Sequence, residues 1–382
     1  MKIIKLAILS IMICSCSQNM KESSELAGND KLETIDITNP KEADDISDIV
    51  DRIKDVSVTQ LETKSGAEIM YIGKMFVSKG RVVIFDQFNM RHQIKVFDKG
   101  GRWMGSSTQG RGPGEIVKAY SVCYDYTNNR IAVSQHDKIT EFNDDMKLIK
   151  EEKCDFYFMH FLEHKGEFVM KVANTQHQTA VDAKDKRIII ADTAFQIKNG
   201  YTPIVKNYQV GNYEDMASTA SGVIISEYLC DTLFLYSDGK LVPRYVLNYE
   251  QKLKVPESYS DSERRNYEEK NDGFYYSGTY LQAGKIQFFR LDNSQRKGEI
   301  YVCRNAETRE NIQILSRRQG DRSLFEIPYA VDGDKFVAVL EYEDVEKNME
   351  TLRKVLTTDD IQKVEAMTEE SNPMLVFYRI DI

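Results

Sequence analysis

Residues 82–86 read VVIFD, residues 94–98 read IKVFD, and the KGG of residues 99–101 follows directly. In an extended strand, successive side chains point to opposite faces, so each run can bury apolar residues on both faces of a sheet. The glycine pair supplies the positive φ angles that a tight turn requires. This stretch is therefore predicted to be a β-hairpin that ends in a tight turn.

Similar pairs of apolar runs recur along the chain. They occupy residues 130–134 and 139–142, 154–160 and 168–172, 222–226 and 231–236, 285–290 and 299–303, and 336–340 and 375–380. With the first hairpin they make six units of roughly 60 residues, and small repeated sheets can bury their faces only against one another. The predicted fold is all-β, a six-bladed β-propeller with small helical insertions near the C-terminus.

Other segments indicate how the ring is completed. The alternating residues 56–61 are predicted to form the outer strand of the last blade and so to cover its open edge. Residues 345–356 place apolar side chains on one face and are predicted to form a helix, and Thr358 is the expected N-cap of a second helix. The charged residues 258–270 are expected to be a solvated helix or loop. Pro243 indicates an outer edge strand, where a missing N–H breaks no ladder bond.

The N-terminus has the features of an export signal. A short basic start precedes the apolar residues 6–13, which are too short to span a bilayer. The following ICSC resembles a bacterial lipobox that would lead to cleavage before Cys16 and lipidation of that cysteine; an ordinary secretory signal is the alternative. We predict a signal peptide over residues 1–15, a flexible tether over 16–34 and the propeller over 35–382.

The residue after the lipidated cysteine favours one membrane. Ser17 stands where an Asp would retain a lipoprotein at the inner membrane, so the outer membrane is predicted, on its periplasmic or cell-surface face. The net charge of −9 is spread along the chain without a basic block, which argues against nucleic acid as a partner. We expect the lipid anchor, rather than the acidic folded domain, to hold the protein to the membrane.

Four cysteines remain in the body of the chain, at Cys123, Cys154, Cys230 and Cys303. An even number in an exported protein permits disulfides. Each lies in or beside a predicted strand, far from the others, and none forms a C-x-x-C pair. Buried free thiols are the favoured interpretation.

Several motifs together resemble the six-bladed β-propeller lipoproteins of Gram-negative gut-type anaerobes, whose shape is similar to NHL-repeat and TolB-like propellers. The most specific are FDKGG at residues 97–101 and GRGPGE at residues 110–115, supported by CDTLF at 230–234 and Asn372-Pro373. The resemblance covers residues 40–382. It implies the fold and the location, and an association with outer-membrane uptake of glycans or peptides, but no catalytic residue.

The GRGPGE loop is not a nucleotide-binding fingerprint, because Pro113 removes a donor and no helix follows. It is interpreted as a blade-connecting loop or, alternatively, as a loop that presents Arg111 and Glu115 to a ligand at the central channel. Asp86, at the end of a strand, is a further candidate by position. The pair Tyr275 and Tyr276 lies in a glycine-bounded segment that is expected to be exposed and able to stack on a sugar or peptide.

Metal and catalytic signatures are weak. His160 and His164 flank Glu163, but they are better explained as one core-facing and one exposed strand residue than as zinc ligands. No G-x-S-x-G elbow accompanies a serine. No cofactor or metal is predicted.

The sequence thus favours a lipid-anchored binding or scaffold subunit with its ligand at one end of the central channel. Its partner would be a glycan, a peptide or a membrane transporter. The alternative is a glycan-active hydrolase or lyase, which would need two carboxylates at the channel mouth.

Overall fold

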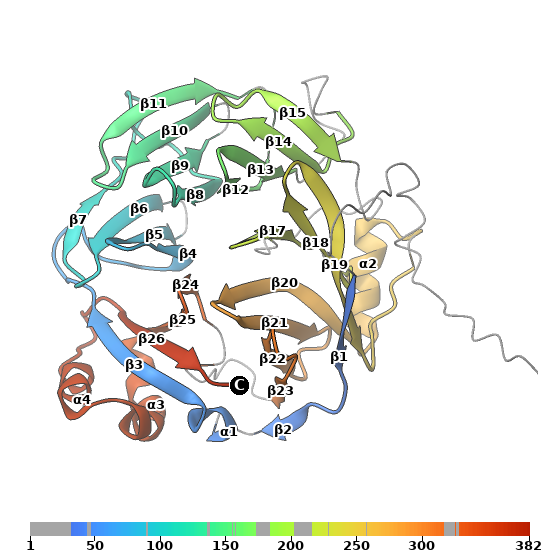
Figure 1. The fold of residues 1–382 in the computed structure, drawn as a ribbon. Helices are drawn as coiled ribbons and strands as arrows, with labels where there is room; N and C mark the ends of the chain where they lie inside the picture. The colour runs from blue at the N-terminus through green and yellow to red at the C-terminus, as the bar shows by residue number, and fades with distance from the viewer. Residues whose placement is uncertain are drawn as a thin grey trace, which may run out of the picture.

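The computed structural model describes residues 32–43, 47–88, 91–135, 138–154, 156, 158–172, 184–201, 216–227, 229–256, 258–316, 325 and 328–382. Within these residues, the strands form six sheets that surround a common centre (Figure 1). The predicted all-β, six-bladed propeller is confirmed.

Each blade is a four-stranded antiparallel sheet. Blade 1 contains β4 (Ile72–Val77), β5 (Arg81–Phe88), β6 (Arg91–Asp98) and β7 (Trp103–Ser106). Blade 2 contains β8 (Ser121–Asp125), β9 (Arg130–Ser134), β10 (Lys138–Asn143) and β11 (Leu148–Lys153). Blade 3 contains β12 (His160–His164), β13 (Glu167–Lys171), β14 (Ile188–Asp192) and β15 (Ile197–Tyr201).

The other three blades complete the circle. Blade 4 contains β16 (Met216–Thr219), β17 (Gly222–Ile225), β18 (Thr232–Ser237) and β19 (Lys240–Tyr249). Blade 5 contains β20 (Phe274–Ala283), β21 (Ile286–Asn293), β22 (Glu299–Asn305) and β23 (Asn311–Ser316). Blade 6 contains β24 (Ala330–Asp332), β25 (Lys335–Leu340), β26 (Met374–Ile380) and β3 (Ile53–Gln60).

The N-terminal strand β3 closes the ring. It pairs antiparallel with the C-terminal strand β26, with Val58 opposite Val376. The first strand of each blade lies innermost; β24 contacts β4, and Phe76 of blade 1 stacks on Tyr124 of blade 2 with ring centroids 6.4 Å apart. The predicted closure by residues 56–61 is therefore confirmed.

Two further N-terminal strands extend blades 4 and 5, which the sequence did not predict. β1 (Glu33–Ile37) adds parallel to β19, and β2 (Lys41–Ala43) adds parallel to β23. Ile35 and Ile37 of β1 are buried, so this strand contributes to the core. The expected edge strand around Pro243 is thus covered from residue 245 onward, because β1 pairs with residues 245–249.

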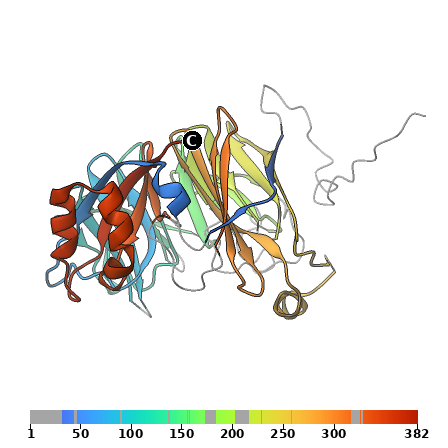
Figure 2. The ribbon, with the colours of Figure 1, turned by 90° about the horizontal axis from the view of Figure 1, so that it is seen from below.

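The helices lie on the outside of the ring. Besides the short α1 (Ser47–Val50), α3 (Tyr342–Val355) and α4 (Thr358–Glu365) lie outside blade 6, and α2 (Asp261–Lys270) lies beyond blades 4 and 5 (Figures 1 and 2). The prediction of a solvated helix near residues 258–270 is confirmed by α2, which Ser260 caps. The second predicted N-cap is wrong by one residue, because Thr357, rather than Thr358, accepts the Asp360 N–H.

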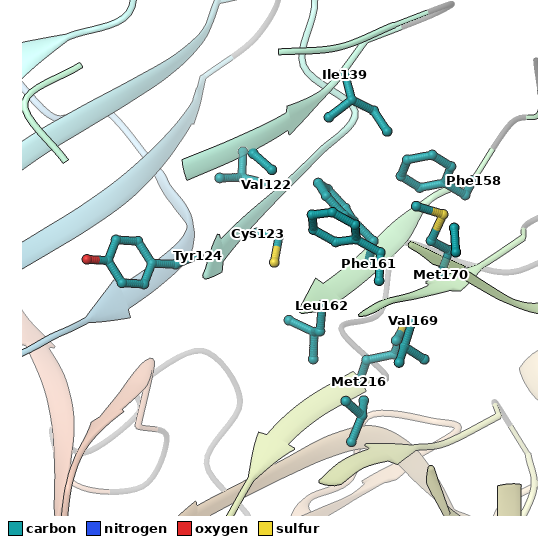
Figure 3. Close-up of a cluster of buried hydrophobic side chains, with 14 of the residues drawn as sticks. Val122, Cys123, Tyr124, Ile139, Phe158, Phe161, Leu162, Val169, Met170 and Met216 are labelled. Atoms are coloured by element: carbon teal, nitrogen blue, oxygen red, sulfur yellow. The ribbon is translucent and has the colours of Figure 1, made fainter. Parts of the chain in front are cut away.

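The core between blades 2 and 3 is apolar and aromatic. Figure 3 shows Phe161 among Val122, Leu162 and Val169, all of them buried. Here the strand predicted over residues 154–160 is wrong, because ladder pairing in β12 begins only where His160 faces Lys171. Phe156 and Phe158 are nevertheless buried, which explains why the apolar pattern suggested a strand.

The four cysteines of the described chain are free thiols. Cys123, Cys230 and Cys303 are buried and Cys154 is half-buried. Burial raises the pKa of the Cys123 and Cys303 thiols to about 12, so both remain protonated at neutral pH. The favoured interpretation of buried free thiols holds for three of the four.

The predicted signal peptide, Cys16 and residues 16–31 of the tether lie outside the described residues. None of the helices in the described residues is both long and apolar enough to cross a membrane.

Candidate binding site

A cavity of about 340 Å³ lies where the innermost strands meet, and we call it the axial cavity. Its walls come from β4, β12, β16, β20 and β24, with Tyr126 after β8 and Arg290 from β21. All six blades therefore contribute to it, as expected for a site at the centre of the ring. Its polar groups include Ser218, Tyr280 and Gln282.

Three exposed tyrosines line the axial cavity. Tyr71, Tyr126 and Tyr329 are 59%, 48% and 45% exposed, although large hydrophobic side chains usually lose most of their contact with water. They come from three different blades: Tyr71 and Tyr329 precede the inner strands β4 and β24, whereas Tyr126 follows β8, so Tyr71 and Tyr126 lie toward opposite ends of the cavity. Tyrosine offers a flat apolar face and a polar edge, and it is enriched at binding surfaces for that reason.

A second cavity of about 560 Å³ adjoins the first, and we call it the basic pocket. Tyr71, Gly73 and Lys74 line both cavities. The other walls come from β5, from His92 of β6, from residues 118–122 and from residues 159–160. The pocket therefore lies between blades 1, 2 and 3, where the inner strands β4, β8 and β12 begin.

The basic side chains described in this pocket are two lysines and two histidines. The Nζ of Lys118 lies 5.1 Å from the ring centre of Tyr120, and the Lys118 side chain is exposed. His92 donates from Nδ1 to the Ala119 carbonyl oxygen at 2.5 Å, which fixes the ring between blades 1 and 2. Among the lining residues that the structure describes, none is Asp or Glu.

His160 is the least usual member of this wall. Its Nε2 is buried and has no hydrogen-bond partner within the described part of the chain. Burial, followed by the positive charges of Lys74, Lys171 and Arg187, lowers the pKa of His160 to about 3. The ring is therefore neutral at pH 7 and lies in a positive field.

Gly73 allows a close approach in the shared wall. A Cβ atom at this position would lie 2.6 Å from Oε1 of Gln87. The Gln87 backbone N–H donates to the carbonyl oxygen of Tyr71 at 2.9 Å. The glycine thus lets the Gln87 side chain lie across β4 while the backbone of the same residue holds Tyr71.

Asp86, a candidate from the sequence, lies behind this wall and does not line either cavity. It is buried, and its Oδ1 accepts the N–H groups of Tyr71 and Met70 at 3.0 and 3.3 Å. Burial raises the pKa of Asp86, against the lowering effect of these N–H groups and of Lys95. The contacts of Asp86 are those of a positioning residue for Tyr71.

Arg111 and Glu115 lie in the loop between blades 1 and 2, and neither lines the axial cavity or the basic pocket. Arg111 is exposed. Glu115 folds back on its own loop, where Oε2 accepts the Gly112 N–H at 2.7 Å. The blade-connecting interpretation of this loop fits the contacts of Glu115.

The expected exposure of Tyr275 and Tyr276 is contradicted. Both are buried in β20, and Tyr276 packs in the core that blades 4 and 5 share. Tyr275 packs against Leu253 instead. A segment bounded by glycines thus proves to be a strand rather than an exposed loop.

A third cavity, of about 650 Å³, lies off the axis beside β1. It is lined by arginines, but Glu33 forms ion pairs with both Arg304 and Arg309. These two arginines therefore already share a carboxylate of the protein, and Asp36 also lines this cavity. The axial cavity and the basic pocket are therefore the stronger candidate site.

Metal binding has no support among the described residues, where no group of three or more His, Cys, Asp or Glu side chains could hold an ion. His160 and His164 lie on one strand, and each has a buried Nε2. His92 lies in the wall of the basic pocket, apart from this pair on β12.

The fold and the cavities define a six-bladed β-propeller with a solvent-accessible site on its axis. The chain belongs to the family described as "Domain of unknown function (DUF4934)", which matches residues 32–379. A comparison with curated proteins gave no match.

Among solved structures, the chain is similar to a protein of Bacteroides fragilis NCTC 9343 described as a "putative exported protein". The two share 18% identity and a TM-score of 0.72, over 91% of this chain and 100% of that one. BamB of Moraxella catarrhalis shares 9% identity and a TM-score of 0.40, over 67% of this chain and 78% of that one. A protein of unknown function from Bacteroides caccae shares 10% identity and a TM-score of 0.40, over 68% and 93%. At these identities, the first similarity supports the fold alone.

Proposed function

We propose that this chain is an exported binding protein that takes its ligand into the axial cavity. The observation that carries the proposal is a cavity on the axis that all six blades line, with exposed tyrosines in its walls and a basic pocket beside it. Ligand sites combine apolar and aromatic walls with a few polar groups, and volumes of roughly 300–1,000 Å³ are typical. The alternative, a glycan-active enzyme, needs two carboxylates at the mouth, whereas the described cavity walls carry cations, amides and hydroxyls.

Tyr71→Ala tests the site, because Tyr71 lines both cavities. Isothermal titration against a panel of neutral and acidic oligosaccharides and tripeptides should give ligands whose affinity falls about tenfold in this variant. Tyr342→Ala is the matched control, since Tyr342 is an exposed tyrosine at the start of α3, outside the ring. Binding that survives Tyr71→Ala unchanged, or no binding by any member of the panel, would contradict the proposal.

We also propose that the protein is anchored to the outer membrane through lipid on Cys16. The support is the sequence Ile13-Cys14-Ser15-Cys16 after a short apolar segment. After cell fractionation, Cys16→Ser is expected in the soluble fraction, while wild type and the control Cys14→Ser stay in the membrane. Retention of Cys16→Ser in the membrane would refute the anchor.

The partner of such a binding protein would be a membrane transporter that receives the ligand. This part of the proposal rests on the predicted location and on the family resemblance, not on a surface of the ring. Affinity capture of the tagged chain from detergent-solubilised membranes should recover a membrane protein. Recovery of none would count against a transporter partner.

A further inference from the structure

We propose that the basic pocket is an anion subsite that binds a carboxylate of the ligand held in the axial cavity. The inference rests on the proposed function and adds the chemical class of the ligand. It follows from the side chains that line the pocket, from one unpaired atom among them and from the adjacency of the two cavities.

The charge of the pocket is opposite to that of the protein. The chain carries a net charge of −9, yet Lys74 and Lys118 line the pocket and none of its described lining residues is a carboxylate. Within a concave site, charges of one sign raise the local concentration of the opposite ion. A negatively charged ligand is therefore attracted to this pocket and repelled by most of the remaining surface.

The unpaired Nε2 of His160 indicates where the ligand is expected to bind. A buried polar atom without a partner is unfavourable, and most such atoms in proteins are hydrogen-bonded. His160 faces Lys171 in the β12–β13 ladder, and Lys171 and Arg187 are both buried behind it. The imidazole thus offers a hydrogen bond to the ligand, while Lys74 and Lys118 of the pocket wall supply the charge, because Lys171 and Arg187 are paired with Glu227.

The two cavities together select a carboxylate attached to a larger body. They share Tyr71, Gly73 and Lys74, so the two cavities lie side by side along the start of β4. The axial cavity presents the exposed tyrosine faces and the polar groups of Ser218 and Gln282. These groups suit a ring that bears hydroxyls, and an acidic sugar has both that ring and the carboxylate.

The test compares one ligand with and without its charge. By isothermal titration, trigalacturonate should bind wild type at least about tenfold more tightly than its methyl ester, and added NaCl should reduce this preference. Lys118→Glu should abolish the preference, with an unchanged melting temperature because Lys118 is exposed. Lys240→Glu, at an exposed lysine that begins β19, is the matched control and should retain it.

Equal affinity for acid and ester, or a preference that survives Lys118→Glu, would overturn the subsite. If Tyr71→Ala still weakened both forms, ligand binding in the axial cavity would stand without the subsite. Inorganic phosphate is the third probe: binding of phosphate, sensitive to Lys118→Glu, without binding of trigalacturonate would overturn the carboxylate assignment. If no probe bound and the wider panel also failed, the proposed function would fall together with the inference.

Discussion

Gly101→Ala is expected to destabilise the propeller by about 3–5 kcal/mol, because the added methyl group would clash with β3, the strand that closes the ring. Gly101 has a φ of +85°, and a Cβ atom there would lie 2.0 Å from the carbonyl oxygen of Gln60 at the end of β3. The Gly101 carbonyl also accepts the Glu62 N–H at 2.8 Å. Thermal unfolding followed by circular dichroism measures the loss.

Gly166→Ala is the matched control for this variant. Gly166 has a similar φ of +80°, but nothing lies within 4 Å of the added Cβ atom. Backbone strain alone should cost about 1–2 kcal/mol. Equal losses of stability in the two variants would show that the contact with Gln60 does not matter.

Deletion of residues 50–62 removes β3 and is expected to cause misfolding or self-association. A monomer with an unchanged melting temperature after this deletion would refute ring closure by β3.

Glu227→Gln is expected to cost about 3–5 kcal/mol, because it removes the carboxylate from a buried charge cluster. Glu227, Lys171 and Arg187 are almost completely buried. The Nε and Nη2 atoms of Arg187 each lie 3.0 Å from a Glu227 oxygen, and the Lys171 Nζ lies 3.4 Å away. The loss of the carboxylate leaves both cations in a medium of low polarity.

This cluster also predicts a pH dependence. Burial alone would raise the pKa of Glu227, but the charges of Lys171 and Arg187 outweigh it and hold that pKa below its ordinary value of 4.5. The stabilisation is therefore present above pH 4.5 and is lost as the pH falls through the lowered pKa. The melting temperatures of wild type and Glu227→Gln should differ most near pH 7 and converge in acid.

Asp238→Asn serves as the control for Glu227→Gln. Asp238 pairs with Lys165 at 2.9 Å, but both side chains are mostly exposed. Such a surface pair is worth about 0–1 kcal/mol. A loss in Glu227→Gln no larger than this, or a difference from wild type that does not change with pH, would contradict the assigned role of the buried carboxylate.

The fold was predictable because strand pattern is a local property. The apolar runs around Phe85 and Phe97 became β5 and β6, and the alternation at residues 56–61 identified the closing strand. β1 was not predicted, because its five residues follow a polar segment. Only the tertiary structure shows that Ile35 and Ile37 are buried.

The site was much less predictable, because no local motif encodes it. The basic pocket draws on four separate stretches, near residues 71–74, 85–92, 118–122 and 159–160. Asp86 was a candidate by its position at a strand end, and sequence does not show that it accepts the Tyr71 and Met70 N–H groups. Likewise, sequence alone could not show that the expected loop around Tyr276 is part of the ten-residue strand β20.

The central claim is that the closed ring binds an anionic ligand on its axis, and a crystal structure of the soluble Cys16→Ser chain with trigalacturonate tests it most directly. The account predicts one carboxylate beside Lys118 and His160, with the attached sugar against Tyr71. A ligand bound to any other face of the ring, or to this cavity with its carboxylates directed away from the basic pocket, would contradict it.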